Sequence, residues 1–205
     1  GVDVSVPTGN FGNIFAAYVA RRMGVPLGRL LLGTNENNIL SVFFNSGSYT
    51  RGKVHHTISP SMDIQVASNF ERFLYFGFGE NGPQVADFMA EFARTGTASV
   101  PPELLANEPI SASAINSEQT LATIARIHKM HGYVLDPHTA VGVAAADLLA
   151  PAATRERPMV CIATAHPAKF PDAIRDALPD VDATHPRLDV LKSLPERLVE
   201  LPATD

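Results

Sequence analysis

The residue pattern with the clearest chemical meaning is a glycine-containing loop at residues 7–14, Pro-Thr-Gly-Asn-Phe-Gly-Asn-Ile. Alternating valines before it predict a strand at residues 2–6, and the pattern after it predicts a helix at residues 13–23. A strand that turns through glycines into a helix directs backbone N–H groups and the positive end of the helix dipole at one point, which suits a phosphate. The loop lacks both the Gly-x-Gly-x-x-Gly spacing and the Gly-Lys-Ser/Thr ending of nucleotide-binding loops. From this pattern alone, a phosphate site and an ordinary strand-to-helix turn both remain open.

Two further polar motifs, Asp136-Pro-His-Thr139 and Thr164–Lys169, lie where other predicted strands end. The hydroxyl of Thr164 is placed to hydrogen-bond an atom of a bound ring. It can donate to a neutral ring nitrogen but cannot keep a pyridinium charged. The alternative is that Thr164 satisfies a local backbone group.

The histidines point to positioning rather than to metal binding. His138 and His166 both stand beside prolines at loop turns, so they are candidates for positioning a substrate or shaping a pocket, although lone histidines are usually structural. His55 and His56 are adjacent and would point apart in extended chain, and His128 and His131 lack nearby carboxylate or thiol ligands. We therefore expect no bound metal.

Composition narrows the function classes. The chain has 205 residues, of which 45% are hydrophobic, and a net charge of −5, which argues against a nucleic-acid partner. No apolar stretch is long enough to cross a membrane and no signal peptide is visible, so we expect a cytoplasmic protein without a membrane partner. The single cysteine, Cys161, lies among apolar residues and is expected to be a buried strand residue rather than a nucleophile.

Predicted strands and helices alternate along the chain. Beyond the first strand and helix, the expected strands are residues 29–33, 110–115 and 159–163, the last of them buried; the expected helices are residues 37–44, 64–76, 84–94, 116–130, 140–149, 170–178 and 195–201; residues 95–109 are expected to form a loop. Strands separated by helices predict an α/β fold with a mostly parallel sheet and helices on both faces. Ligands bind such sheets at the carboxyl ends of the strands, where the three polar motifs would converge.

The chain resembles a known family, threonine synthase, in its bacterial and fungal branch. The resemblance is carried by six motifs that occur in that family's order and span nearly the whole chain. They are residues 6–14, 34–40 (Thr-Asn-Glu-Asn-Asn-Ile-Leu), 59–64 (Ser-Pro-Ser-Met-Asp-Ile), 68–72 (Ser-Asn-Phe-Glu-Arg), 135–142 (Leu-Asp-Pro-His-Thr-Ala-Val-Gly) and 164–170 (Thr-Ala-His-Pro-Ala-Lys-Phe). The blocks at 59–64 and 68–72 favour this family over other enzymes of the same fold.

The resemblance implies a tryptophan-synthase-β-like, fold type II enzyme that uses pyridoxal 5′-phosphate (PLP). Such an enzyme converts O-phospho-L-homoserine and water to L-threonine and phosphate by elimination and hydration, the last step of threonine biosynthesis. It implies that backbone amides of Thr8, Gly9, Asn10, Phe11, Gly12 and Asn13 cradle the cofactor phosphate and that Thr164 pairs with the pyridine nitrogen. Asp136, His138, Thr139, His166 and Lys169 are candidates for the rest of the pocket.

The chain departs from the family in lacking the Phe-Lys-Asp-type motif that carries the Schiff-base lysine. Residues 1–205 are therefore expected to be the C-terminal part of the large catalytic region, with the N-terminal domain and that lysine upstream, and the missing half of the polypeptide as partner. No catalytic residue is expected in this chain, and the fragment alone is expected to be inactive. The alternatives are another fold type II lyase or dehydratase, a non-catalytic phosphate-binding module, or an inert piece of core.

Overall fold

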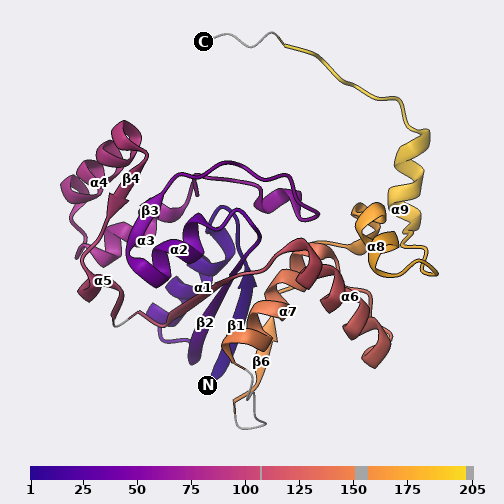
Figure 1. Ribbon diagram of the computed structural model, residues 1–205, viewed down its shortest axis with the longest axis horizontal. Helices are drawn as coiled ribbons and strands as arrows, with labels where there is room; N and C mark the ends of the chain where they lie inside the picture. The colour runs from indigo at the N-terminus through magenta and orange to yellow at the C-terminus, as the bar shows by residue number, and fades with distance from the viewer. Residues whose placement is uncertain (107, 151–156, 202–205) are drawn as a thin grey trace.

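The computed structural model describes residues 1–106, 108–150 and 157–201 and contains a four-stranded parallel sheet (Figure 1). The strands lie in the order β5-β2-β1-β6. Their bounds are β1 Val2–Pro7, β2 Leu27–Thr34, β5 Ile110–Ala114 and β6 Met159–Cys161. This arrangement confirms the expected α/β class with a parallel sheet.

Residues of the two central strands alternate between two helical layers. Leu30 and Leu32 of β2 join the core cluster that contains Ile14 of α1 (Gly12–Arg22) and Leu40 of α2 (Ile39–Ser46). Leu31, between them, packs against the opposite layer, formed by α7 (Pro137–Leu149). Because successive side chains of a strand point to opposite faces, the continuous apolar run of β2 is buried on both sides.

Helix α7 lies close to the sheet because there is a glycine on each side of the contact, Gly142 in α7 and Gly33 in β2. A Cβ at Gly142 would lie 2.9 Å from Cδ of Pro7, and a Cβ at Gly33 would lie 3.0 Å from the Cβ of Ala145. The hydroxyl of Ser5 donates to the carbonyl of Gly142. This close packing sets the N-terminus of α7 beside the carboxyl end of β1.

A second unit covers the α1 and α2 face. It consists of the hairpin β3 (Ser48–Thr50) with β4 (Thr97–Ser99), the 3₁₀ turn η1 (Pro60–Met62), and the helices α3 (Phe70–Gly77), α4 (Gly82–Thr95) and α5 (Pro102–Ala106). Its aromatic rings pack together with those of α1 and α2, and they include Phe11, Phe43, Phe44, Tyr49, Phe70, Phe73 and Phe92.

The remaining helices flank α7 and extend toward the C-terminus (Figure 1). They are α6 (Ser117–His131), η2 (Pro167–Lys169), α8 (Pro171–Ala177), α9 (Pro186–Asp189) and η3 (Val190–Ser193). Helix α6 begins with a capping box in which Asn116 and Gln119 exchange hydrogen bonds. Among the described residues, no helix combines the length and apolar character needed to cross a membrane.

At the amino end of the sheet, Asp3 is buried and binds two arginines. Its carboxylate accepts from Nε of Arg29 at 2.8 Å and from Nε of Arg157 at 2.9 Å. Burial by itself raises the pKa of Asp3, but the hydrogen bonds from Arg29 and Arg157 outweigh it and hold that pKa below its ordinary value.

Four sequence-based expectations are wrong. The helix expected at residues 64–76 begins only at Phe70, because preceding groups bind the 49–53 segment instead: Gln65 Nε2 donates to the Lys53 carbonyl and the Ala67 N–H donates to the Tyr49 hydroxyl. Residues 95–109 are not all loop, since they contain β4 and α5.

The other two errors concern the C-terminal third. Residues 159–163 are not a buried strand: β6 ends at Cys161 and pairs only with β1 in the described sheet, so Val160 is 45% exposed and Cys161 is partly exposed. Residues 195–201, expected to form a helix, have no regular secondary structure. The helical turns instead form earlier, in α9 and η3, after the His185 side chain caps α9. Pro195 disfavours helical backbone at Leu194 and so ends η3.

Candidate functional site

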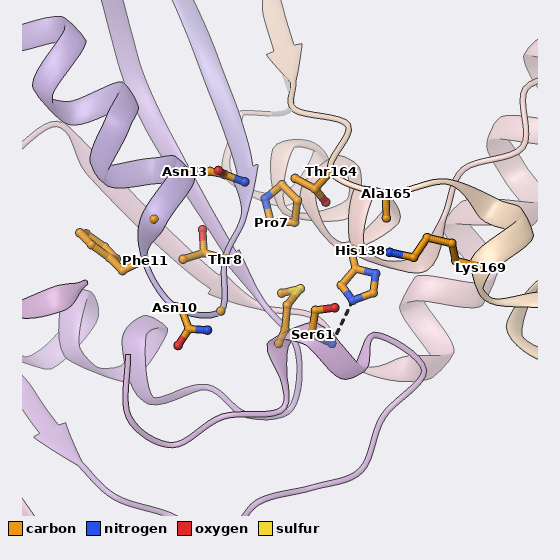
Figure 2. Close-up of a pocket in the computed structure, with 13 residues that line it drawn as sticks. Pro7, Thr8, Asn10, Phe11, Asn13, Ser61, His138, Thr164, Ala165 and Lys169 are labelled. Carbon is orange, nitrogen blue, oxygen red and sulfur yellow. Dashed lines mark hydrogen bonds between the residues drawn. The ribbon is translucent and has the colours of Figure 1, made fainter. Parts of the chain in front are cut away.

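A cavity of about 310 Å³ lies at the carboxyl ends of β1 and β6 (Figure 2). Four segments that are distant in the sequence line it. They are the loop at residues 7–13, Ser61 and Met62 of η1, His138 at the start of α7, and the segment from Thr164 to Lys169. The sheet therefore brings the three polar motifs together, because the carboxyl ends of parallel strands share one edge.

The loop is anchored by Phe11, whose side chain points away from the cavity (Figure 2). Phe11 is fully buried and has left-handed backbone with φ of +63°. That conformation costs a non-glycine residue roughly 1–2 kcal/mol, and the packing of its ring against Phe44, Phe70 and Phe73 offsets the cost. The buried ring therefore holds the turn that leads into α1.

This turn leaves backbone donors open toward the cavity. Phe11 is the N-cap of α1 and makes no side-chain capping bond. Within the described ranges, the N–H groups of residues 9–13 donate to no atom of the protein. Unpaired N–H groups at the positive end of a helix bind a phosphate well, so the loop fits the phosphate of PLP.

Neighbouring segments hold the loop from behind. A Cβ at Gly9 would lie 2.9 Å from the carbonyl oxygen of Ser61 and 3.0 Å from Cα of Met62, so only glycine fits there. The carbonyl of Asn10 accepts from the backbone N–H of Asn69 at 3.1 Å and from its Nδ2 at 2.9 Å. The side chain of Thr8 also stabilises the loop, because its hydroxyl donates to the carbonyl of Val6 at 2.8 Å.

On the opposite wall, Asp136 organises the N-terminus of α7. One oxygen of its buried carboxylate accepts from the backbone N–H of His138 at 2.9 Å, and the other accepts from the hydroxyl of Thr139. Burial by itself raises the pKa of Asp136, but the nearby His138 side chain and the hydrogen bonds from Thr139 and the His138 N–H outweigh it and hold that pKa below its ordinary value. Asp136 and Thr139 do not line the cavity and act from behind its wall.

Thr164 reaches the cavity with an unused hydroxyl. Its backbone N–H donates to Oγ1 of Thr139 at 3.2 Å, which fixes the segment against α7. Its own hydroxyl makes no hydrogen bond within the described part of the chain. The hydroxyl of Thr164 is thus available to a ligand. The contact that holds Thr164 in place is made by its backbone N–H and not by its side chain.

Lys169 is a cation in a cavity without carboxylates. Its side chain is exposed, and its ammonium group points toward the cavity beside His138 (Figure 2). No Asp or Glu is among the lining residues, and no described carboxylate lies within ion-pair distance of Lys169. An anionic ligand is the chemistry that suits this wall.

The two candidate histidines separate. His138 is 3% exposed and lines the cavity. His166 does not line it; its Nδ1 accepts from the N–H of Ala168 at 3.2 Å and its ring lies against His185. Cys161 also lies outside the cavity lining, and burial raises the pKa of its thiol to about 11, which keeps it protonated.

Sequence reasoning did not assign roles to the residues that position η1. Asp63 is their centre: its carboxylate accepts from Nδ2 of Asn35 at 2.7 Å, from the hydroxyl of Thr57 at 2.7 Å and from Nδ2 of Asn37 at 3.1 Å. This network ties residues 55–63 to the end of β2 and so brings Ser61 and Met62 to the cavity. The motifs at 34–40 and 59–64 contain several of these residues, but their spacing gave no sign of the contact.

A parallel α/β sheet with an anion-binding loop at the carboxyl end of a central strand is the arrangement of the fold type II PLP enzymes. Comparison with known proteins narrows this class to one family. A family model described as "Threonine synthase, C-terminal" matches residues 139–205. Threonine synthase of Pseudomonas aeruginosa is 45% identical over 178 residues, which cover 86% of this chain and 38% of that protein.

Solved structures of threonine synthases also match this chain. PLP-bound threonine synthase from Brucella melitensis has a TM-score of 0.85 at 43% identity, over 92% of this chain and 40% of that one. Yeast threonine synthase has a TM-score of 0.88 at 36% identity, over 95% of this chain and 43% of that one. The chain spans about two fifths of the length of these relatives. It is related to the C-terminal part of threonine synthases.

Proposed function

We propose that this chain binds PLP and supplies the phosphate-binding and ring-binding walls of a threonine synthase active site. The observation that carries the proposal is the convergence of the open N–H groups of residues 9–13 and the unused hydroxyl of Thr164 on one cavity. The amides would bind the phosphate, and the hydroxyl would donate to the pyridine nitrogen. PLP, when bound, acts as a sink for electrons released at the substrate carbons.

The contact at Thr164 has a chemical consequence. A hydroxyl donates a hydrogen bond to a neutral nitrogen, whereas a carboxylate would stabilise a protonated, positively charged one. Thr164 would therefore hold the ring orientation and leave the nitrogen neutral, with its own position fixed through Thr139 and Asp136.

We further propose that Lys169 receives an anionic group of the substrate. The cofactor phosphate would occupy the amides of the loop, and the substrate O-phospho-L-homoserine brings a second phosphate together with a carboxylate. Lys169, with no carboxylate partner among the described residues, is suited to attract either group.

The complete reaction needs more than this chain. Residues 1–205 would form the C-terminal part of the large catalytic domain of a longer polypeptide, whose N-terminal part would supply the Schiff-base lysine. That polypeptide would convert O-phospho-L-homoserine and water to L-threonine and phosphate, as the kinship with threonine synthases suggests.

The test uses the full-length polypeptide. Purified protein with added PLP should release phosphate and L-threonine in equal amounts from O-phospho-L-homoserine, while the 205-residue chain alone should release neither. Turnover of L-serine or L-threonine to a keto acid, with no reaction on the phosphorylated substrate, would instead identify a dehydratase. Turnover by the isolated chain would contradict the assignment of the lysine to the upstream part.

A further inference from the structure

His138 connects two walls of the cavity through a hydrogen bond of defined direction. Its Nε2 lies 3.2 Å from the backbone nitrogen of Ser61 (Figure 2). The Ser61 nitrogen carries a hydrogen and can only donate, so Nε2 must be the acceptor and must be unprotonated. The neutral ring then carries its proton on Nδ1.

The other ring nitrogen faces the capping carboxylate of α7. Nδ1 lies 3.3 Å from Oδ1 of Asp136, and it has no hydrogen-bond partner within the described residues. A proton on Nδ1 is attracted by the ionised carboxylate beside it, which favours the tautomer that the Ser61 contact requires. Asp136 therefore helps to set which nitrogen of His138 accepts.

The Ser61 contact acts on the phosphate loop. The carbonyl of Ser61 and Cα of Met62 are the atoms that leave no room for a Cβ at Gly9. Met62 in turn packs against Val141 in a small buried cluster that includes residues of α7. Displacement of Ser61 would therefore be transmitted directly to the backbone that carries the open amides.

The opposite side of the ring faces the segment that carries Thr164 and Lys169. The ring centroids of His138 and Phe170 lie 4.7 Å apart. His138 is thus in contact with η1 on one side and with residue 170 on the other, and it sets their separation across the cavity.

We propose that His138 is a positioning residue: by accepting from the Ser61 N–H, it holds η1 against the phosphate loop and so sets the affinity for the PLP phosphate. The inference rests on the proposed function, since it assumes that the loop binds PLP. A neutral acceptor at the place of Nε2 is the required feature, and the aromatic ring itself is secondary.

Two amide substitutions in the full-length protein separate this role from simple packing. In His138→Gln the side-chain oxygen can reach the place of Nε2, whereas in His138→Asn it reaches only the place of Nδ1. We expect PLP titration, followed by absorbance, to give a dissociation constant within about threefold of wild type for Gln and about tenfold weaker for Asn. In the Asn variant the partly buried Ser61 N–H loses its acceptor, and η1 is no longer held against the loop. Inorganic phosphate should compete with PLP about tenfold less well in the Asn variant as well.

Controls make the outcomes distinct. His131→Gln, at an exposed position at the end of α6, should match wild type, and urea unfolding without cofactor should give similar midpoints for the Gln and Asn variants. Equal PLP affinities for the Gln and Asn variants would overturn the role of His138 while leaving the proposed function intact. Failure of the wild-type protein to bind PLP would overturn both.

Discussion

Two residue-level features of the cavity bear directly on ligand binding. They are the exclusion of side chains at Gly9 and the charge of Lys169, which has no carboxylate partner among the described residues. Both are recognisable as residue types in the sequence. Their consequences depend on atoms supplied by other segments, Ser61 and Met62 for the glycine and a lining without carboxylates for the lysine.

At Gly9, substitution by alanine should weaken PLP binding in the full-length protein about tenfold or more. The new Cβ would meet backbone atoms of Ser61 and Met62 at 2.9 and 3.0 Å, and these cannot move aside as a flexible side chain would, so the loop itself must shift. Absorbance titration with PLP measures the effect. Gly82→Ala is the matched control, because a Cβ there meets nothing within 4 Å, and an equal loss of affinity in both variants would argue against the steric explanation.

At Lys169, substitution by methionine should raise the KM for O-phospho-L-homoserine about fivefold to tenfold and change kcat little. The reason is the loss of a charge-assisted contact that is made equally to the substrate and the transition state. Steady-state kinetics of phosphate release test this. Lys129→Met removes the same charge from an exposed position on α6 and should leave KM unaltered, and an unchanged KM in the Lys169 variant would exclude a role in substrate binding.

At the scale of elements, α7 organises the site. Its N-terminus supplies Asp136, His138 and Thr139, and its glycine contact with Pro7 fixes it against the strand that ends in the phosphate loop. The Asp136 carboxylate therefore caps α7 and also, through the Thr139 hydroxyl, helps to hold Thr164 in place.

The cap should give a measurable pH dependence of stability. The pKa of Asp136 is lowered in the folded chain from an ordinary value of 3.8, so its ionised form favours folding above that pH. This contribution should be complete above about pH 5, should decline as the pH falls below the unfolded pKa, and should be gone below the folded pKa. Asp136→Asn should cost about 1–2 kcal/mol near pH 7, with the deficit shrinking toward pH 3.

Urea unfolding of wild type and variant between pH 3 and 7 measures this difference. Asp172→Asn serves as the control, since that carboxylate is 87% exposed at the start of α8. A deficit for Asp136→Asn that stayed constant over the whole range would show that the carboxylate does not contribute through its charge.

At the scale of the whole molecule, the two ends of the sheet differ: one end lines the cavity, and the other carries the ion pairs of a buried aspartate. The carboxyl ends of β1 and β6 hold the cavity, whereas Asp3 at the amino end links β1 to Arg29 of β2 and to Arg157. Binding and stability should therefore be separable by mutation.

Asp3→Ala should lower the free energy of unfolding by about 2–3 kcal/mol, because it leaves two partly exposed arginines without their buried carboxylate. The dissociation constant for PLP should not change, since the substitution lies at the opposite end of the sheet. Urea unfolding and PLP titration test the two statements separately, with the exposed Asp180→Ala as control. Loss of PLP affinity together with stability would show that the two ends are coupled.

The sequence predicted helices and strands well where their bounds are set by residues close together in the chain. The apolar run of β2 and the residues that cap and end α6 are signals carried by neighbouring residues, and the observed bounds differ from the expected ones by one or two residues. Prediction failed where distant partners decide: residues 64–69 bind the 49–53 segment and Asn10 instead of forming a helix, and three-residue strands such as β4 are too short to show a period.

For the site, the sequence by itself determined the chemical groups, namely a glycine loop before a helix, a threonine and a lysine after a strand, and a capping Asp-Pro-His-Thr. The resemblance in six motifs, now supported by the relatives, also came from sequence alone. Only the tertiary structure decided that His138 faces the cavity while His166 turns away, and that Phe11 is a buried anchor. Side-chain direction and the pairing of polar atoms depend on segments far apart in the chain, and those meet only when the parallel strands bring their carboxyl ends to one edge.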